Sequence, residues 1–147
     1  MKRTPLRLAL ILLLVLPHLP AQEKPGTKEP DTELGKTMDG FNGAWRKLRK
    51  QVADPASNAS SLELAATIKA GLEKALTLQP ARAQDVPAAD REKFIQSYQA
   101  RLKEFIALLP KLEAALKADD NATAQALVQK MAAAQREDHK EFRRPEM

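Results

Sequence analysis

Residues 32–53, TELGKTMDGFNGAWRKLRKQVA, decide the fold. Apolar side chains recur in this stretch at alternating spacings of four and three residues, at Leu34, Met38, Phe41, Trp45, Leu48 and Val52. This period is typical of the apolar face of a helix that packs in a bundle. Asp31 or Thr32 can cap the N-terminus of such a helix. The stretch therefore predicts an amphipathic helix with its polar side facing solvent.

Three glycines surround Met38 in this predicted helix, at positions 35, 40 and 43. Each weakens a helix interior by up to about 1 kcal/mol relative to alanine. We therefore expect either a loosely wound first turn around Met38 or the close approach of a bulky group.

Three further segments show helical periodicity, over residues 58–79, 87–118 and 122–143. Their predicted inward residues are Leu62, Ala65, Ala66, Ile68, Leu72, Ala75 and Leu76; then Phe94, Tyr98, Leu102, Phe105, Leu109, Leu112 and Leu116; then Ala124, Leu127, Val128, Met131, Gln135, His139 and Phe142. No strand pattern competes with them. Short connections make successive helices antiparallel neighbours, so the sequence predicts an all-α, up-down-up-down four-helix bundle.

Pro110 lies inside the third segment, where it removes one backbone hydrogen bond. We expect a kinked helix, because the apolar face continues in phase across the proline. Two separate helices are the alternative.

The first 21 residues have the three parts of a secretory signal: basic Lys2, Arg3 and Arg7, an apolar run, and a small residue, Ala21, at the expected cleavage point. The run is shorter than the roughly 20 residues that span a bilayer. We expect a signal peptide over 1–21, a flexible lead-in over 22–31 and the bundle over 32–144. The exported, monomeric protein would then reside in the periplasm with no membrane span.

Composition excludes several classes of site. The chain has no cysteine, so disulfides, iron–sulfur clusters and thioether-linked haem are impossible. Loss of the signal lowers the net charge from +5 to +2, and no basic block is interleaved with aromatic residues, which argues against nucleic acid. Asn58 and Asn121 fit the glycosylation pattern, but both stand where a helix cap is expected.

Met38 and His139 are the residues that could carry chemistry. Helices one and four of such a bundle are adjacent and antiparallel, so the start of the first lies level with the end of the fourth. Met38 lies roughly 9 Å and His139 roughly 6 Å from that end, at 1.5 Å per residue. Both face inward, and a thioether facing an imidazole can bind haem iron on its two axial sides. The alternative is that Met38 fills the core and His139 complements the helix end.

Two short motifs resemble the soluble cytochrome b-562 family of exported four-helix bundles. The first is Leu34-Gly-Lys-Thr-Met38-Asp-Gly-Phe41-Asn42; the second is Asp138-His139-Lys140-Glu141-Phe142-Arg143, with Ala124-Gln125-Ala126 earlier in the same helix. The resemblance covers about residues 31–144. It implies one non-covalent haem b per chain, with Met38 and His139 as the axial ligands.

The resemblance also implies a haem pocket. Its candidate residues are Phe41, Trp45, Phe105, Met131, Gln135 and Arg136, and either Leu102 or Tyr98 could take the place of Phe105. Gln135 stands where the family usually carries an arginine, and Arg136 is beside it. The basic end at Arg136, Lys140, Arg143 and Arg144 could meet haem propionates or an acidic partner.

The implied function is electron transfer with a redox partner, not enzymatic catalysis. One alternative is a haem-free bundle that binds or scaffolds another envelope protein. Another is a haem carrier without redox partners. A catalytic triad lacks partners for His139, and a di-metal site would need a glutamate at Arg136, three residues before the histidine.

Overall fold

The computed structural model describes residues 32–144. The elements are α1 (Glu33–Gln51), the 3₁₀ turn η1 (Pro55–Ser57), α2 (Asn58–Ala75), the 3₁₀ turn η2 (Ala81–Asp85), α3 (Ala88–Ile106), α4 (Leu109–Lys117) and α5 (Asn121–Phe142). The described residues contain no strand. The predicted signal peptide over 1–21 and the lead-in over 22–31 lie outside the described residues.

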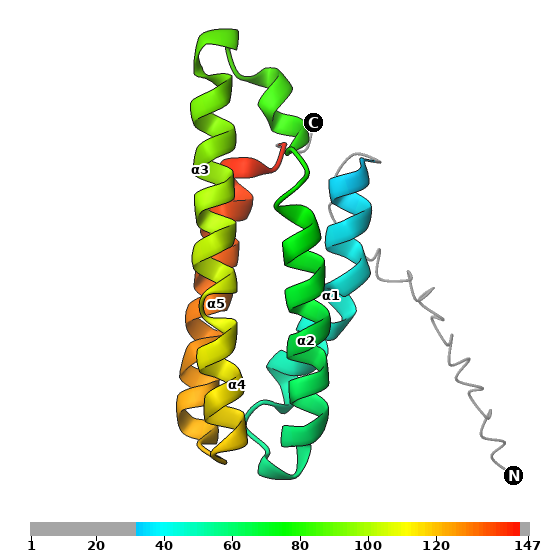
Figure 1. Ribbon diagram of the computed structural model, residues 1–147, viewed down its shortest axis with the longest axis vertical. Coiled ribbons are helices and arrows are strands. Elements are labelled where there is room, and N and C mark those ends of the chain that lie inside the picture. The colour runs from blue at the N-terminus through cyan, green and yellow to red at the C-terminus, as the bar shows by residue number, and fades with distance from the viewer. Residues whose placement is uncertain (1–31, 145–147) are drawn as a thin grey trace, which may run out of the picture.

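The helices form four antiparallel arms, with α3 and α4 sharing the third (Figure 1). The beginning of α1 and the end of α5 lie at the same end of the bundle (Figure 1). The predicted all-α, four-helix bundle is therefore confirmed. Within the described range, no helix is both long and apolar enough to cross a membrane.

The third arm is two helices, so the expectation of one kinked helix was wrong. The backbone N–H of Leu108 bonds to the carbonyl of Phe105, three residues back, at 3.1 Å, which tightens and ends α3. Pro110 lies in the first turn of α4. A first-turn position needs no intrahelical N–H donor, so proline fits there and not in a continuous interior.

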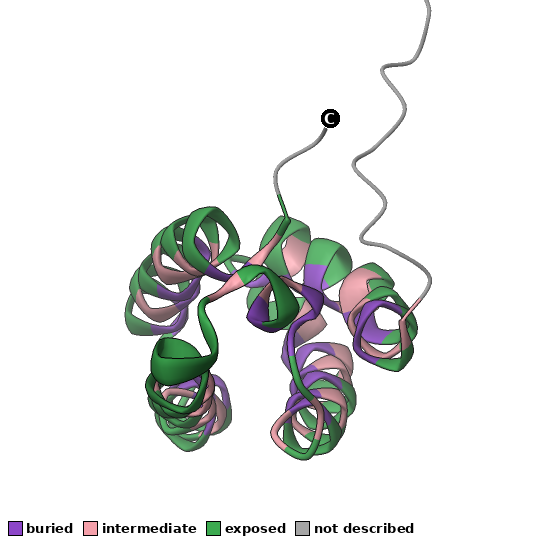
Figure 2. Ribbon diagram, turned by 90° about the horizontal axis from the view of Figure 1, so that it is seen from above, coloured by how far each residue is buried: buried purple, intermediate pink, exposed green. Residues whose placement is uncertain are grey.

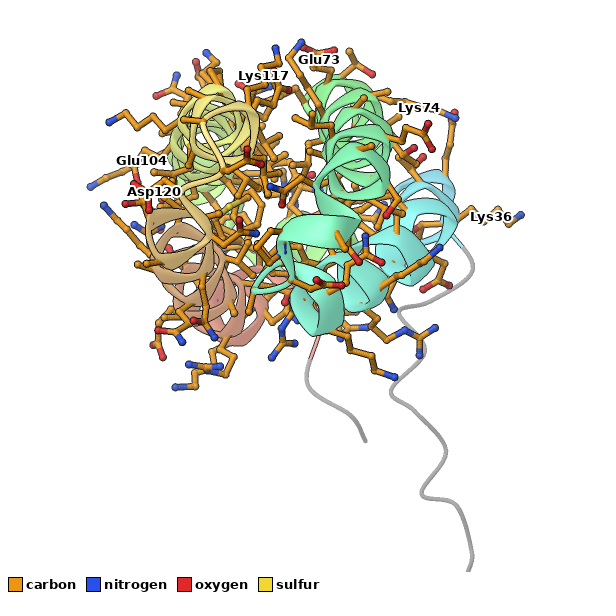
Figure 3. All side chains as sticks on the ribbon, turned by 90° about the horizontal axis from the view of Figure 1, so that it is seen from below. Lys36, Glu73, Lys74, Glu104, Lys117 and Asp120 are labelled. Atoms are coloured by element: carbon orange, nitrogen blue, oxygen red, sulfur yellow. The ribbon has the colours of Figure 1, made fainter. Side chains whose placement is uncertain are left out.

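The apolar faces of all arms point into one core (Figure 2). Leu48, Ile68, Leu109, Leu112, Leu116 and Met131 are its large, fully buried side chains. Ala66, predicted to face inward, is exposed. Charged side chains such as Lys36, Glu73 and Lys117 project outward around the bundle (Figure 3). Burial of these faces is the main favourable term for the fold.

Thr32 caps α1: its Oγ1 accepts a hydrogen bond from the backbone N–H of Gly35 at 3.0 Å. The helix continues without interruption through its glycines. A methyl group added at Gly40 or Gly43 would meet no atom within 4 Å. A loosely wound turn around Met38 is therefore not observed, and no group of the described chain lies close against Gly40 or Gly43.

Asn58 and Asn121 are the first residues of α2 and α5, one position beyond the caps that were expected. Both side chains are buried. Asn121 Nδ2 donates to the Val52 carbonyl and to Asn58 Oδ1, both at 2.8 Å, and Asn58 Nδ2 donates to Asp119 Oδ1 at 2.8 Å. Asp120 caps α5 instead. These amides fasten together the ends of α1, α2 and α5, a role that sequence periodicity does not reveal.

The connection between α2 and α3 holds the opposite end of α5. Arg82 Nη1 donates to the carbonyls of Lys140 and Glu141 at 2.9 and 2.7 Å. The Arg144 guanidinium forms two bonds with the Asp85 carboxylate, at 2.7 and 2.9 Å. The last carbonyls of a helix have no hydrogen-bond donor within the helix. Arg82 provides a donor for two of these carbonyls.

Candidate haem pocket

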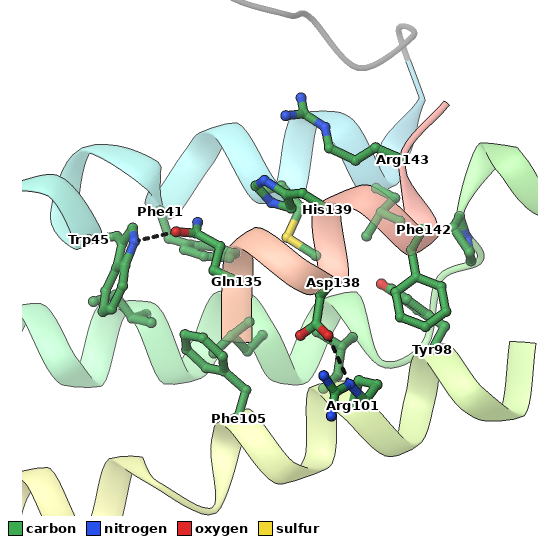
Figure 4. A pocket seen from close by; sticks show the side chains of 16 residues that line it. Phe41, Trp45, Tyr98, Arg101, Phe105, Gln135, Asp138, His139, Phe142 and Arg143 are labelled. Atoms are coloured by element: carbon green, nitrogen blue, oxygen red, sulfur yellow. Dashed lines mark hydrogen bonds and ion pairs between the residues drawn. The ribbon is translucent and has the colours of Figure 1, made fainter. Parts of the chain in front are cut away.

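A pocket lies between α1, α2, α3 and α5 (Figure 4). Its lining includes residues from the beginning of α1 and from the end of α5. Its walls are mostly apolar, and its polar groups come from α3 and from the last turns of α5. It is lined by Leu34, Met38, Phe41, Trp45, Ile68, Leu72, Pro80, Tyr98, Arg101, Leu102, Phe105, Gln135, Asp138, His139, Phe142 and Arg143. An apolar cleft with a few convergent polar groups is the usual form of a cofactor site.

Met38 and His139 both line this pocket, Met38 from α1 and His139 from α5. Met38 is partly buried, whereas His139 is exposed at the pocket mouth. The beginning of α1 and the end of α5 lie at the same end of the bundle, so the two residues line one cleft. Their role as ligands remains a prediction.

Aromatic side chains form the wall on the far side from the α5 terminus. The Trp45 and Phe105 rings meet edge to face, with centroids 5.8 Å apart. The Trp45 indole N–H donates to Gln135 Oε1 at 2.9 Å, which joins α1 to α5 across the pocket (Figure 4). Phe41, Trp45, Phe105 and Gln135, all predicted pocket residues, line it together, and so do Leu102 and Tyr98.

Two predicted pocket residues lie elsewhere. Met131 is fully buried in the core and does not line the pocket. Arg136 is exposed and lines a separate groove between α1 and α5. The helical rotation of about 100° per residue turns Arg136 away from its neighbour Gln135. Met131 lies on nearly the same face as Gln135 but four residues, or about 6 Å, nearer the start of α5.

The pocket also contains three charged residues, of which the sequence pointed to Arg143 as a possible partner of the haem and assigned no role to Arg101 or Asp138. Arg101 Nε donates to Asp138 Oδ1 at 2.9 Å and joins α3 to α5 (Figure 4). The hydrogen bond and the negative charge of Asp138 raise the pKa of Arg101. Arg143 lies beside His139 (Figure 4). Asp138 is next to His139 in the sequence and Arg143 is one helical turn after it, so their positions near the pocket could have been predicted. Arg101 could not, because it lies on a different helix.

The surroundings of His139 favour a neutral imidazole. Partial burial of the ring lowers the pKa of His139, the positive charge of Arg143 lowers it further, and Asp138 opposes the shift. A neutral ring has a free nitrogen lone pair, which is the form that binds a metal. The described residues contain no group of three or more His, Cys, Asp or Glu side chains that could hold a metal ion.

These residues fit haem better than a bare metal ion. A porphyrin supplies the equatorial ligands, so the protein needs only one or two axial donors, and a thioether with an imidazole is a known pair. Aromatic and aliphatic walls suit the macrocycle. Arg143 adds a guanidinium group that can bind a carboxylate such as a propionate, whereas Arg101 is paired with Asp138 and Glu104.

The family model described as cytochrome b562 matches residues 33–143 of this chain, which is nearly all of the described range. No curated protein matches the chain, and no solved structure does either.

Proposed function

The chain belongs to the cytochrome b562 family, and from this premise we propose that it is a periplasmic electron-transfer protein that binds one haem b between Met38 and His139. Export would follow from the predicted signal over residues 1–21, with cleavage near Ala21. The observation that carries the proposal is that Met38 and His139, on opposite ends of the sequence, line one apolar pocket. When bound, haem supplies a one-electron couple.

The chain's own residues do the remaining work. Met38 from α1 and His139 from α5 would hold the haem iron, through a thioether sulfur and an imidazole nitrogen. Phe41, Trp45 and Phe105 exclude water from the macrocycle. The Trp45–Gln135 and Arg101–Asp138 bonds fix α5 against α1 and α3, so that His139 keeps its position during electron transfer.

The test is haem titration of the purified protein, followed by absorption spectra in both oxidation states. We expect a sharp reduced α-band and a shifted Soret peak, both lost in His139→Ala. Met38→Leu should keep haem but change the axial ligation and lower the reduction potential, because a methionine ligand raises it.

Met131→Leu is the matched control, since Met131 is buried outside the pocket and such a swap costs less than about 1.5 kcal/mol. A free-haem spectrum in the unsubstituted protein would refute haem binding and favour a haem-free scaffold. An intact spectrum in Met38→Leu would refute methionine ligation. Reduction without any transfer to a redox protein would instead favour a haem carrier.

A further inference from the structure

The last two turns of α1 carry four cations in five residues, Arg46, Lys47, Arg49 and Lys50. All four are exposed, and no carboxylate of the described chain pairs with any of them. Elsewhere, cations such as Lys69, Arg101, Lys140 and Arg144 do form ion pairs.

The fold alone gives little reason for this concentration of charge. A cation in the last turn complements the helix dipole, which accounts for Arg49 and Lys50. Like charges three or four residues apart repel, however, and Arg46 stands in that relation to both Arg49 and Lys50. The run therefore costs some stability in the free protein, and an anionic partner would relieve that cost.

A groove extends this positive surface onto α5. Arg49 and Arg136 lie on its two helices, the amides of Gln125 and Gln129 line it, and Val52, Val128 and Ala132 complete it. Arg136 is exposed and forms no ion pair with a described residue. Guanidinium groups bind carboxylates through two parallel hydrogen bonds, so the groove suits an aspartate or glutamate side chain. We call Arg46, Arg49, Lys50 and Arg136 the basic face.

The Trp45 side chain lies between the basic face and the candidate haem pocket, since it contacts Arg49 and also lines the pocket. The Arg49 guanidinium carbon lies 5.9 Å from the centre of the Trp45 ring, and Trp45 itself is only 3% exposed. Trp45 lines the pocket and bonds to Gln135. A molecule bound to the basic face would therefore lie close to the haem, as rapid electron transfer requires.

We propose that the basic face is the docking surface for an acidic redox protein, an inference that rests on the proposed function. A protein surface fits better than a lipid bilayer, because helices that bind membranes expose large apolar side chains beside their cations, whereas Leu48 and Val52 are buried here. Complementary charge acts mainly on the association rate and on the choice of partner.

The experiment compares two probe proteins, an acidic ferredoxin and a basic cytochrome c, with the haem-loaded protein. The reversal variant is Arg46→Glu/Lys50→Glu, which spares the Arg49–Trp45 contact. Its matched control is Lys111→Glu/Lys117→Glu, an equal charge change at exposed positions on α4. At low ionic strength we expect the reversal variant to slow electron transfer from reduced ferredoxin at least tenfold and to accelerate transfer with cytochrome c. The control should change both rates less than threefold, and the differences should vanish near 1 M salt.

A second measurement does not depend on haem. Titration of the ¹⁵N-labelled, haem-free protein with the ferredoxin should shift amide signals at residues 46–50 and near Arg136, and Arg136→Glu should weaken these shifts. Equal effects of the reversal and control variants, or shifts confined to another face, would overturn the proposal. An unaltered haem spectrum in all variants separates that outcome from failure of haem binding itself.

Discussion

Phe41 owes its place in the pocket wall to a glycine on the neighbouring helix. A Cβ atom at Gly71 would lie 2.9 Å from Cγ and Cε1 of Phe41, and closer still to Cδ1. Gly43 offers a matched control, because a Cβ there meets nothing within 4 Å. We expect Gly71→Ala to be less stable than Gly43→Ala by about 1–3 kcal/mol in urea unfolding, since the gain in helix propensity is shared and the overpacking is not. Equal stabilities would show that the Phe41 ring moves aside freely.

The hydrogen bond between Trp45 and Gln135 gives a second prediction at this scale. The indole is buried, so Gln135→Leu leaves its N–H without an acceptor, at a cost of about 1–3 kcal/mol. Gln135→Glu keeps an acceptor oxygen and should retain most of the stability. Trp45 is the single tryptophan, so unfolding followed by its fluorescence reports on this site directly. A Gln135→Leu protein as stable as the glutamate variant would contradict the prediction.

His139 should make the haem-free protein less stable in mild acid. Its pKa in the folded chain is lowered by burial and by Arg143, while in the unfolded chain it is about 6.5. Between these two pKa values the unfolded state binds more protons, so stability rises with pH. The contribution of neutral His139 to the free energy of unfolding is complete above about pH 6.5. It is lost as the pH falls from there through the lowered pKa of the folded chain. Chemical unfolding at a series of pH values should show this slope, and His139→Gln should remove it.

At the scale of elements, Arg82 is the link that fastens the end of α5 carrying His139. Its side chain donates hydrogen bonds to the carbonyls of Lys140 and Glu141. These carbonyls have no donor within the helix, and without Arg82 the last turn would fray. We expect Arg82→Gln to speed hydrogen exchange at the last-turn amides, including Arg143, which bonds to the His139 carbonyl. The amides near the Asp120 cap should keep their protection. Lys130→Gln, an exposed change on the same helix, serves as the control and should alter neither end.

The elements also show what the sequence can and cannot predict. The faces of α1 and α5 were predictable because their period fixes which residues point inward, and antiparallel order then brings Met38 and His139 to one pocket. The division of the third arm into α3 and α4 could not be predicted, because the apolar pattern of the sequence continues unbroken past Pro110. The Arg101–Asp138 pair escaped prediction for another reason, since it depends on the rotation of one helix against another. Arg136 entered the predicted pocket through the resemblance alone, whereas the apolar period had placed Gln135 inward, and one residue along a helix is a turn of about 100°.

The whole molecule has two ends of different construction. At one end, buried amides of Asn58 and Asn121 tie together α1, α2 and α5. At the other end lies the pocket, where hydrogen bonds between α1 and α5 in the described chain stop at Trp45 and Gln135. The buried amides hold the first end together, and at the second end Met38 and His139 lie on α1 and α5 beyond the Trp45–Gln135 bond that joins these two helices. Stability and cofactor binding are thus assigned to separate ends of the bundle.

This separation predicts opposite effects for two substitutions. Asn121→Ala should lower the free energy of unfolding by about 1–3 kcal/mol, because the Val52 carbonyl and the Asn58 amide lose their buried partner. It should nevertheless bind haem with an unchanged spectrum at temperatures where it remains folded. Met38→Leu should cost less than about 1.5 kcal/mol without haem but alter the haem spectrum. Denaturant unfolding without haem, paired with haem titration of the same samples, measures both quantities. If Asn121→Ala changed the spectrum as much as Met38→Leu does, the two ends would be coupled, and the pocket would depend on packing along the whole bundle.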